Sequence, residues 1–229
     1  MAKHIGIVAC SAEGAALCYR TICSEAPKIM GEHMHPEISM HTYPLSDYMK
    51  FIYDDNWDGV AGLMISSAKK LADIGADFAI SPDNTIHQAF DIVKEKSPIP
   101  WIHIAENIAQ IAAQNKYKKL GITGTKYLMT GPVYPDALKK YHIKFEIPDE
   151  YDRDKINEII FGQLVYGNFP EESRLYFSEV IQKLKDRGCD AVVLGCTEIP
   201  LLVKPDDCPL PTLDSTRLLS KAALQYALE

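Results

Sequence analysis

The chain has 229 residues, enough for one large domain or two small lobes with a buried core. Its 24 lysines and arginines are outnumbered by 31 acidic residues, so it lacks the basic surplus that attracts nucleic acid. No apolar run reaches the roughly 20 residues of a membrane span, and the N-terminus enters a strand-like run without a signal peptide. These properties exclude nucleic acid and membranes as partners and favour a cytoplasmic protein.

Six cysteines are scattered along the chain without any C-x-x-C pair. In a chain of this size, such spacing is typical of a reducing compartment rather than of a disulfide framework. No metal-ligand spacing, G-x-G-x-x-G motif or P-loop occurs. The sequence therefore argues against zinc, nucleotide and phosphoryl chemistry, and we expect no metal and no cofactor.

Short β-rich runs alternate with longer helical stretches in the first half of the chain. Apolar residues recur at helical spacing in the longest stretch, where Val60, Leu63 and Met64 mark one face. In chain order, the predicted elements are a strand over 4–9, a helix over 15–25, a strand over 37–43, a helix over 58–75, a strand over 78–81, a helix over 86–96 and a strand over 100–104.

The same alternation starts again in the second half. The predicted elements there are strands over 119–123, 143–147 and 191–194 and helices over 127–141, 154–165 and 171–187. This pattern predicts the α/β class with mostly parallel sheets. Two similar halves predict two lobes related by pseudo-twofold symmetry. We expect an N-terminal lobe over residues 1–97, completed by 207–229, and a second lobe over 98–206.

One segment occurs twice, over residues 75–85 and 188–198. In both copies a glycine ends a predicted helix, an aspartate follows two residues later, and a short apolar run leads into a polar triplet. Asp83 lies eight residues after Gly75, and Cys196 lies eight residues after Gly188. The two copies therefore place a carboxyl group and a thiol at matching positions.

Four loops follow predicted strands, over residues 10–14, 82–85, 123–125 and 195–198. Ligands of open α/β sheets bind beyond the carboxyl ends of the strands. If the lobes pack face to face, these loops line one cleft, with Asp83 and Cys196 on opposite walls. Two proton carriers on opposite sides of a carbon suit stereoinversion, because one removes the proton and the other returns one. Cys196 would need activation and Asp83 a raised pKa for both to act well near neutral pH.

Both residues also have a structural interpretation. A single Asp-Asn-Thr after a strand is usually a turn and helix cap, and a single internal cysteine is usually a small buried hydrophobe. The matched position in two copies favours catalysis by Cys196 and leaves both interpretations of Asp83 open.

Several polar side chains in the same loops are candidates for holding a substrate carboxylate through hydroxyl, amide or helix-terminal N–H groups. Each of them taken alone is more typical of a helix cap. The candidates are Ser11, Asn84, Thr85, Thr125 and Thr197.

Four further residues have open roles. Lys155 could supply positive charge, although a solvated lysine is the commoner case. Glu198 could act in the site or simply cap the next turn. His87 is more typical of a satisfied histidine on a helix face than of a base. Cys10 lies in a site loop, but the structural interpretation applies to it as to the other cysteines.

Two motifs resemble the aspartate/glutamate racemase superfamily, within it the aspartate racemase-like branch. Residues 194–202, Leu-Gly-Cys-Thr-Glu-Ile-Pro-Leu-Leu, resemble the family's second cysteine motif. Residues 83–87, Asp-Asn-Thr-Ile-His, match its first motif, which usually reads Cys-Asn-Thr-x-His. Gly124-Thr125 and residues 152–160 resemble the same branch, so the resemblance covers essentially the whole chain. It implies a two-lobed, commonly dimeric enzyme that inverts the α-carbon of acidic amino acids with two cysteines and without PLP.

The resemblance also implies roles for single residues. It makes Cys196 the second catalytic cysteine and Lys155 a contact for the substrate carboxylate. It assigns substrate binding to Asn84, Thr85, Thr125 and Thr197.

This chain departs from the family at two places. Asp83 stands where the first cysteine is expected, and Ala9-Cys10-Ser11 stands where Gly-Gly-Met is usual. Some relatives that lack one of the two cysteines still racemise, and others are arylmalonate decarboxylases. Three functions follow as hypotheses: a racemase or epimerase of aspartate or glutamate, a decarboxylase or isomerase of a dicarboxylic acid that uses Cys196 alone, and a non-catalytic binding homologue.

Overall fold

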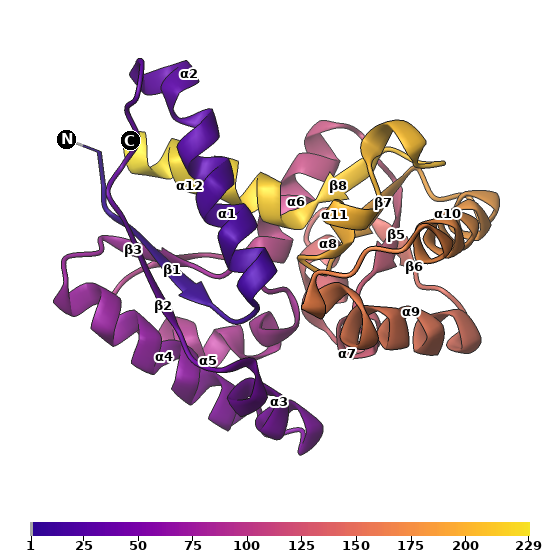
Figure 1. The fold of residues 1–229 in the computed structure, drawn as a ribbon, viewed down its shortest axis with the longest axis horizontal. Helices are drawn as coiled ribbons and strands as arrows, with labels where there is room; N and C mark the ends of the chain where they lie inside the picture. Colours follow the sequence, from indigo (N-terminus) through magenta and orange to yellow (C-terminus); the bar gives the residue numbers. More distant parts are fainter. Residues whose placement is uncertain (1) are drawn as a thin grey trace. The chain divides into compact units, whose positions relative to one another are not determined.

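The computed structural model describes residues 2–229, and over these residues it holds two parallel β-sheets of four strands each. The chain divides into two compact units (Figure 1). One unit runs to Ile104 and also includes Thr216–Glu229, and the other contains Ala105–Ser215. The predicted α/β class with two similar, parallel-sheet lobes is confirmed. The unit boundaries lie after Ile104 and Ser215, whereas the sequence placed them after residues 97 and 206.

The first unit has the strand order β2-β1-β3-β4. Its inner strand β1 is buried at every residue, as expected of a parallel strand covered on both faces. Because side chains alternate along a strand, Ile5 and Ile7 pack against Cys18 of α1 on one face, while Val8 packs near Leu71 of α4 on the other. The elements are β1 (Ile5–Ala9), α1 (Ala12–Glu25), α2 (Pro27–Met30), β2 (Ile38–Thr42), α3 (Leu45–Tyr53), α4 (Trp57–Asp73), β3 (Phe78–Ile80), a 3-10 helix (Thr85–Ala89), α5 (Phe90–Lys96), β4 (Trp101–Ile102) and, at the C-terminal end, α12 (Ser215–Leu228).

The second unit repeats this topology with the strand order β6-β5-β7-β8. Its core joins Ile156 and Ile160 of α9 to Phe177 and Ile181 of α10 and to Val192 of β7. The elements are α6 (Ile104–Gln114), β5 (Lys119–Thr123), α7 (Lys126–Thr130), α8 (Val133–Lys139), β6 (Lys144–Glu146), α9 (Glu150–Gly162), a 3-10 helix (Leu164–Tyr166), α10 (Glu171–Asp186), β7 (Ala191–Leu194), α11 (Ile199–Leu202), a 3-10 helix (Pro205–Asp207) and β8 (Thr212–Asp214).

Some predicted elements differ from the structure. The single helix predicted over 127–141 is wrong: α7 ends at Thr130 and α8 begins at Val133. Gly131 and Pro132 lie between them, and proline disfavours helical backbone in the residue before it. The helix predicted over 86–96 begins as a 3-10 turn, and the one predicted over 154–165 begins earlier, at Glu150. The sequence did not predict α3, α6, α12 or β8.

The duplicated Gly-x-Asp has a structural role in both units. Gly75 and Gly188 follow the ends of α4 and α10 with φ of 92° and 84°, a left-handed conformation that favours glycine. Asp77 Oδ2 accepts the backbone N–H of His4, just before β1, at 2.6 Å. Asp190 Oδ2 accepts two backbone N–H groups at the start of β5, at 2.6 and 2.9 Å. Each aspartate thus ties the start of its own strand to the start of a neighbouring one.

Two further observations concern the helices and the cysteines. Within residues 2–229, none of the helices is both long enough and apolar enough to cross a membrane. Over the same residues, no disulfide joins any of the six cysteines.

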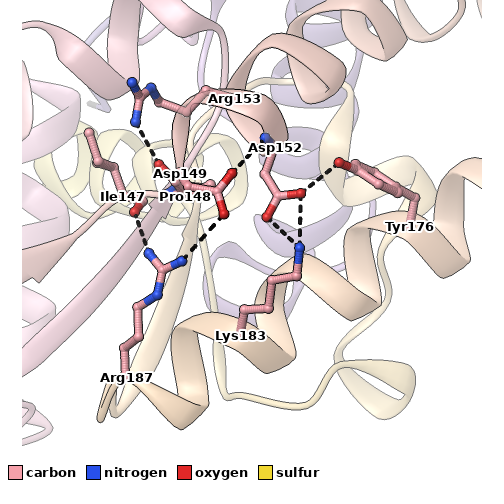
Figure 2. A network of polar contacts seen from close by, with 8 residues as sticks. All are labelled: Ile147, Pro148, Asp149, Asp152, Arg153, Tyr176, Lys183 and Arg187. Carbon is pink, nitrogen blue, oxygen red and sulfur yellow. Dashed lines mark hydrogen bonds and ion pairs between the residues drawn. The ribbon is translucent and has the colours of Figure 1, made fainter.

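A buried carboxylate joins α9 to α10 in the second unit (Figure 2). The Asp152 side chain is 1% exposed and accepts hydrogen bonds from Tyr176 Oη at 2.7 Å and from Lys183 Nζ at 2.7 and 3.0 Å. Burial alone would raise the pKa of Asp152, but the hydrogen bonds from Lys183 and Tyr176 outweigh burial and hold this pKa below its ordinary value. Below them, Arg187 pairs with Asp149 at 3.7 Å. The network fixes the start of α9, the helix that carries Lys155.

We expect Asp152→Asn to lower the free energy of unfolding by about 2 kcal/mol at neutral pH, since the Lys183 side chain is half exposed and limits the cost. A depressed pKa in the folded protein stabilises it above the ordinary aspartate pKa of 3.8, and this stabilisation is lost as the pH falls through the depressed value. The difference between wild type and variant should therefore shrink in acid. Urea unfolding at neutral pH and near pH 3 measures both effects. Asp154→Asn, at an exposed position of the same helix, should change neither. Equal stability of Asp152→Asn and wild type at neutral pH would contradict this assignment.

Candidate functional site

The first unit collects its candidate residues at one edge of its sheet. Strands β1 and β3 are neighbours and run parallel, with Ile5 opposite Phe78, so their carboxyl ends lie at the same edge. Ser11 follows β1 and caps α1, where its Oγ accepts the Gly14 N–H at 3.3 Å. The loop after β3 contributes Asp83, Asn84 and Thr85, of which Asn84 and Thr85 are buried and Asp83 is half-buried. The structure brings these four predicted residues to one place.

The half-buried Asp83 makes a turn contact through its carboxyl group. Its Oδ1 accepts the Ile86 N–H at 3.3 Å, a capping contact for the 3-10 helix that follows. The Asp83 carbonyl accepts a hydrogen bond from His87 Nδ1 at 2.7 Å, and the Ile104 N–H faces His87 Nε2 at 3.4 Å. One ring nitrogen of His87 then donates and the other accepts, which requires the neutral ring. The His87 side chain therefore stabilises the loop through hydrogen bonds, in agreement with the structural interpretation of its sequence position.

Tyr48 is a neighbour of this loop that the sequence did not reveal. It lies on α3 and is fully buried, and its hydroxyl lies close to the Ser67 side chain. Burial raises the pKa of Tyr48, and the charges of Cys10 and Asp83 raise it further. Tyr48 is therefore a neutral phenol within electrostatic range of both residues. No sequence signal separates it from an ordinary core tyrosine.

The second unit places its own candidates in the equivalent position. Strands β5 and β7 are parallel neighbours, so the loops after them share one edge of the sheet. Thr125 caps α7 by accepting the Leu128 N–H at 3.2 Å. The Gly195 N–H donates to the Thr123 carbonyl at 2.8 Å, and a Cβ on Gly195 would lie 2.6 Å from that carbonyl oxygen. Only glycine allows this close approach, which holds Cys196 beside the Thr125 loop.

Hydrogen bonds join Cys196 and Thr197 to Glu198. Cys196 Sγ donates to Glu198 Oε2 at 3.0 Å, and Thr197 Oγ1 donates to the same oxygen at 2.7 Å. Cys196 is 9% exposed and Glu198 is 1% exposed. Although Glu198 occupies the N-cap position of α11, its side chain makes no capping hydrogen bond. Of its two predicted roles, the one in the site fits this geometry and the cap does not.

Lys155 lies apart from these contacts, on α9. Its side chain is 47% exposed and its Nζ lies 3.2 Å from Glu158 Oε2. The helix does approach the Thr125 loop, because the Lys126 N–H donates to Asn157 Oδ1 at 3.0 Å. A contact between Lys155 and a substrate carboxylate stays a prediction.

Each unit thus presents one proton carrier at the carboxyl edge of its sheet. The first unit presents the Asp83 carboxyl group, and the second presents the Cys196 thiol next to the Glu198 carboxyl group. Among residues 2–229 there is no group of three or more side chains arranged to hold a metal ion. Both edges carry groups suited to moving protons.

Comparison with known proteins agrees with this arrangement. Residues 5–223 match the family described as Asp/Glu/Hydantoin racemase. The broad specificity amino-acid racemase RacX of Bacillus subtilis is 21% identical over 194 residues, which cover 85% of this chain and 83% of RacX.

Solved structures resemble the whole chain. A candidate Asp/Glu racemase from Yersinia pestis has a TM-score of 0.89 at 30% identity, covering 99% of this chain and 100% of the other. An aspartate racemase homologue from Pyrococcus horikoshii has a TM-score of 0.85 at 25% identity, with full coverage of both chains. These matches confirm the resemblance found in the two motifs. The chain therefore belongs to the Asp/Glu/Hydantoin racemase family and is an isomerase of the amino-acid racemase type.

Proposed function

We propose that the protein is a cofactor-independent racemase of an acidic amino acid, aspartate or glutamate. In this proposal the loops of the two units face one cleft, and Asp83 and Cys196 act on opposite sides of the substrate α-carbon. The observation that carries it is the matched placement of these two groups. Both follow an inner strand of a four-stranded sheet with the same topology, and both lie eight residues after a glycine of left-handed conformation.

The hydrogen bonds support a starting protonation state. The Cys196 thiol donates to Glu198 Oε2 and therefore carries its proton. In the proposed starting state the Asp83 carboxyl group, which accepts the Ile86 N–H, is ionised. In this state Asp83 is the base. It removes the α-proton, the electron pair stays on the α-carbon, and the Cys196 thiol returns a proton to the other face. Asp83 ends protonated and Cys196 ends as a thiolate, which is the starting state for the opposite enantiomer.

The remaining predicted residues would hold the substrate. Hydroxyl and amide groups of Ser11, Asn84 and Thr85 line the first edge, and those of Thr125 and Thr197 line the second. Lys155 would supply positive charge to a substrate carboxylate. The family resemblance also supports a homodimer, which analytical ultracentrifugation tests. The cysteine spacing supports a location in the cytoplasm.

Proton exchange in deuterated water tests the proposed function directly. We expect at least one of aspartate and glutamate to lose its α-proton NMR signal and its optical rotation when either enantiomer is incubated with the enzyme, without added PLP. Release of carbon dioxide from a dicarboxylic acid, without α-proton exchange in either amino acid, would instead support the decarboxylase. Binding of the same acids without any exchange would support the non-catalytic homologue, and either result would overturn the racemase.

A further inference from the structure

Only one of the two carboxylate oxygens of Glu198 accepts hydrogen bonds from the described residues. Its Oε2 accepts two hydrogen bonds, from Cys196 Sγ at 3.0 Å and from Thr197 Oγ1 at 2.7 Å. Its Oε1 is buried and has no hydrogen-bond partner among residues 2–229. The residue as a whole is 1% exposed, so bulk water does not solvate this oxygen.

No cation of the described chain compensates this carboxylate. Within residues 2–229, Glu198 forms no ion pair with lysine, arginine or histidine. A buried carboxylate without a cation or a full set of donors costs several kcal/mol. A proton on Oε1 would lower this cost but would leave its own O–H without an acceptor. Oε1 is therefore an acceptor for which the described chain supplies no donor, and a positively charged donor suits a carboxylate oxygen best.

The geometry points to Glu198 Oε1 as the acceptor of the substrate's α-ammonium group, so that the site selects α-amino acids over dicarboxylic acids of the same skeleton. This inference rests on the proposed function and extends it, because it names the group that separates a substrate from its amine-free analogue. It also gives Glu198 direct contact with the substrate.

The same carboxylate would then hold both reacting partners. The α-carbon is one covalent bond from the ammonium nitrogen. Cys196 Sγ is hydrogen-bonded to Oε2 of the same carboxylate. A substrate held through its amine therefore has its α-carbon close to the thiol. The Glu198 carboxylate also keeps the bound amine protonated. An α-ammonium group makes the α-C–H more acidic than that of an amine-free acid.

Matched pairs of ligands test this inference by calorimetry. The pairs are DL-aspartate with succinate and DL-glutamate with glutarate, where each second member lacks only the amine. Racemic amino acids are used because their turnover releases no net heat. Wild type should bind at least one amino acid about 10- to 100-fold more tightly than its partner, as expected for a charge-assisted hydrogen bond. Glu198→Gln should lose most of this preference through weaker amino-acid binding, with the affinity for the amine-free acid unchanged or higher. Glu172→Gln, at an exposed position of α10, should keep the wild-type preference.

Two results would overturn the inference. One is a wild-type enzyme that binds succinate and glutarate as tightly as the amino acids, which needs no variant and applies even if Glu198→Gln does not fold. The other is an equal loss of both members of a pair in Glu198→Gln, as expected if a protonated Glu198 held a substrate carboxylate. A Glu198-dependent preference without any α-proton exchange would keep this inference and remove the proposed racemase. Racemisation with a preference that does not depend on Glu198 would do the reverse.

Discussion

Replacement of Cys196 by alanine is expected to lower racemisation of the substrate in both directions by about 10²- to 10⁴-fold, the usual contribution of a positioned acid or base. Each direction needs the thiol once, as the acid in one and as the base in the other. Any residual deuterium exchange should be confined to one enantiomer, because only Asp83 remains to remove and return a proton. Proton NMR in deuterated water, started from each enantiomer in turn, measures exchange and inversion separately.

Cys189→Ala is the matched control for this variant. Cys189 is also buried in the second unit, at 5% exposure, and burial raises its pKa to about 11. A thiol of this kind packs as a small hydrophobe and takes no part in proton transfer near neutral pH. Its replacement should lower stability slightly and leave racemisation intact. Unchanged exchange in Cys196→Ala, with both enantiomers, would show that the mechanism is wrong.

Replacement of Asp83 by asparagine should also lower racemisation by about 10²- to 10⁴-fold. The amide oxygen of asparagine can still accept the Ile86 N–H, so the loop keeps its turn while the proton carrier is lost. Residual exchange should now be confined to the enantiomer whose α-proton faces Cys196, the opposite one from that in Cys196→Ala. Asp91→Asn, at an exposed position of α5, should behave as wild type in the same NMR assay.

Asp83→Cys separates the loss of a proton carrier from a change of its kind. Because a thiol can also move protons, this variant should recover part of the activity, with a changed rate or pH profile. In wild type the two directions should differ in pH profile, since one needs ionised Asp83 and the other ionised Cys196. Kinetics of Asp83→Asn identical to those of wild type would mean that Asp83 transfers no proton, and the single-cysteine alternatives would then gain weight.

The strands and the repeat could be predicted because their signals are local. The strands predicted over 119–123 and 191–194 match β5 and β7 residue for residue, since buried parallel strands are short apolar runs between turn signals. The repeated Gly-x-Asp and its spacing predicted that Asp83 and Cys196 follow equivalent strands, and the two sheets have the same strand order. One error is the helix predicted over 127–141, where the break at Gly131 and Pro132 was missed. Another is α12, which was not predicted as a helix, although residues 207–229 were expected to complete the first unit.

For the site, too, one part could be predicted from the sequence and another part could not. From residue order alone, the candidate side chains of each half could be assigned to the loops at the carboxyl ends of its strands, because parallel strands end at a common edge. The contact of the Cys196 thiol with Glu198, the unbonded Oε1 and the burial of Tyr48 next to Asp83 could not. Residues two apart in sequence have no fixed relation in a turn, so the backbone path after β7 sets the direction of the Glu198 side chain. Hydrogen bonding and burial are properties of the packed chain. The sequence motif gives only the residue types, and the tertiary structure places a buried carboxylate next to the Cys196 thiol.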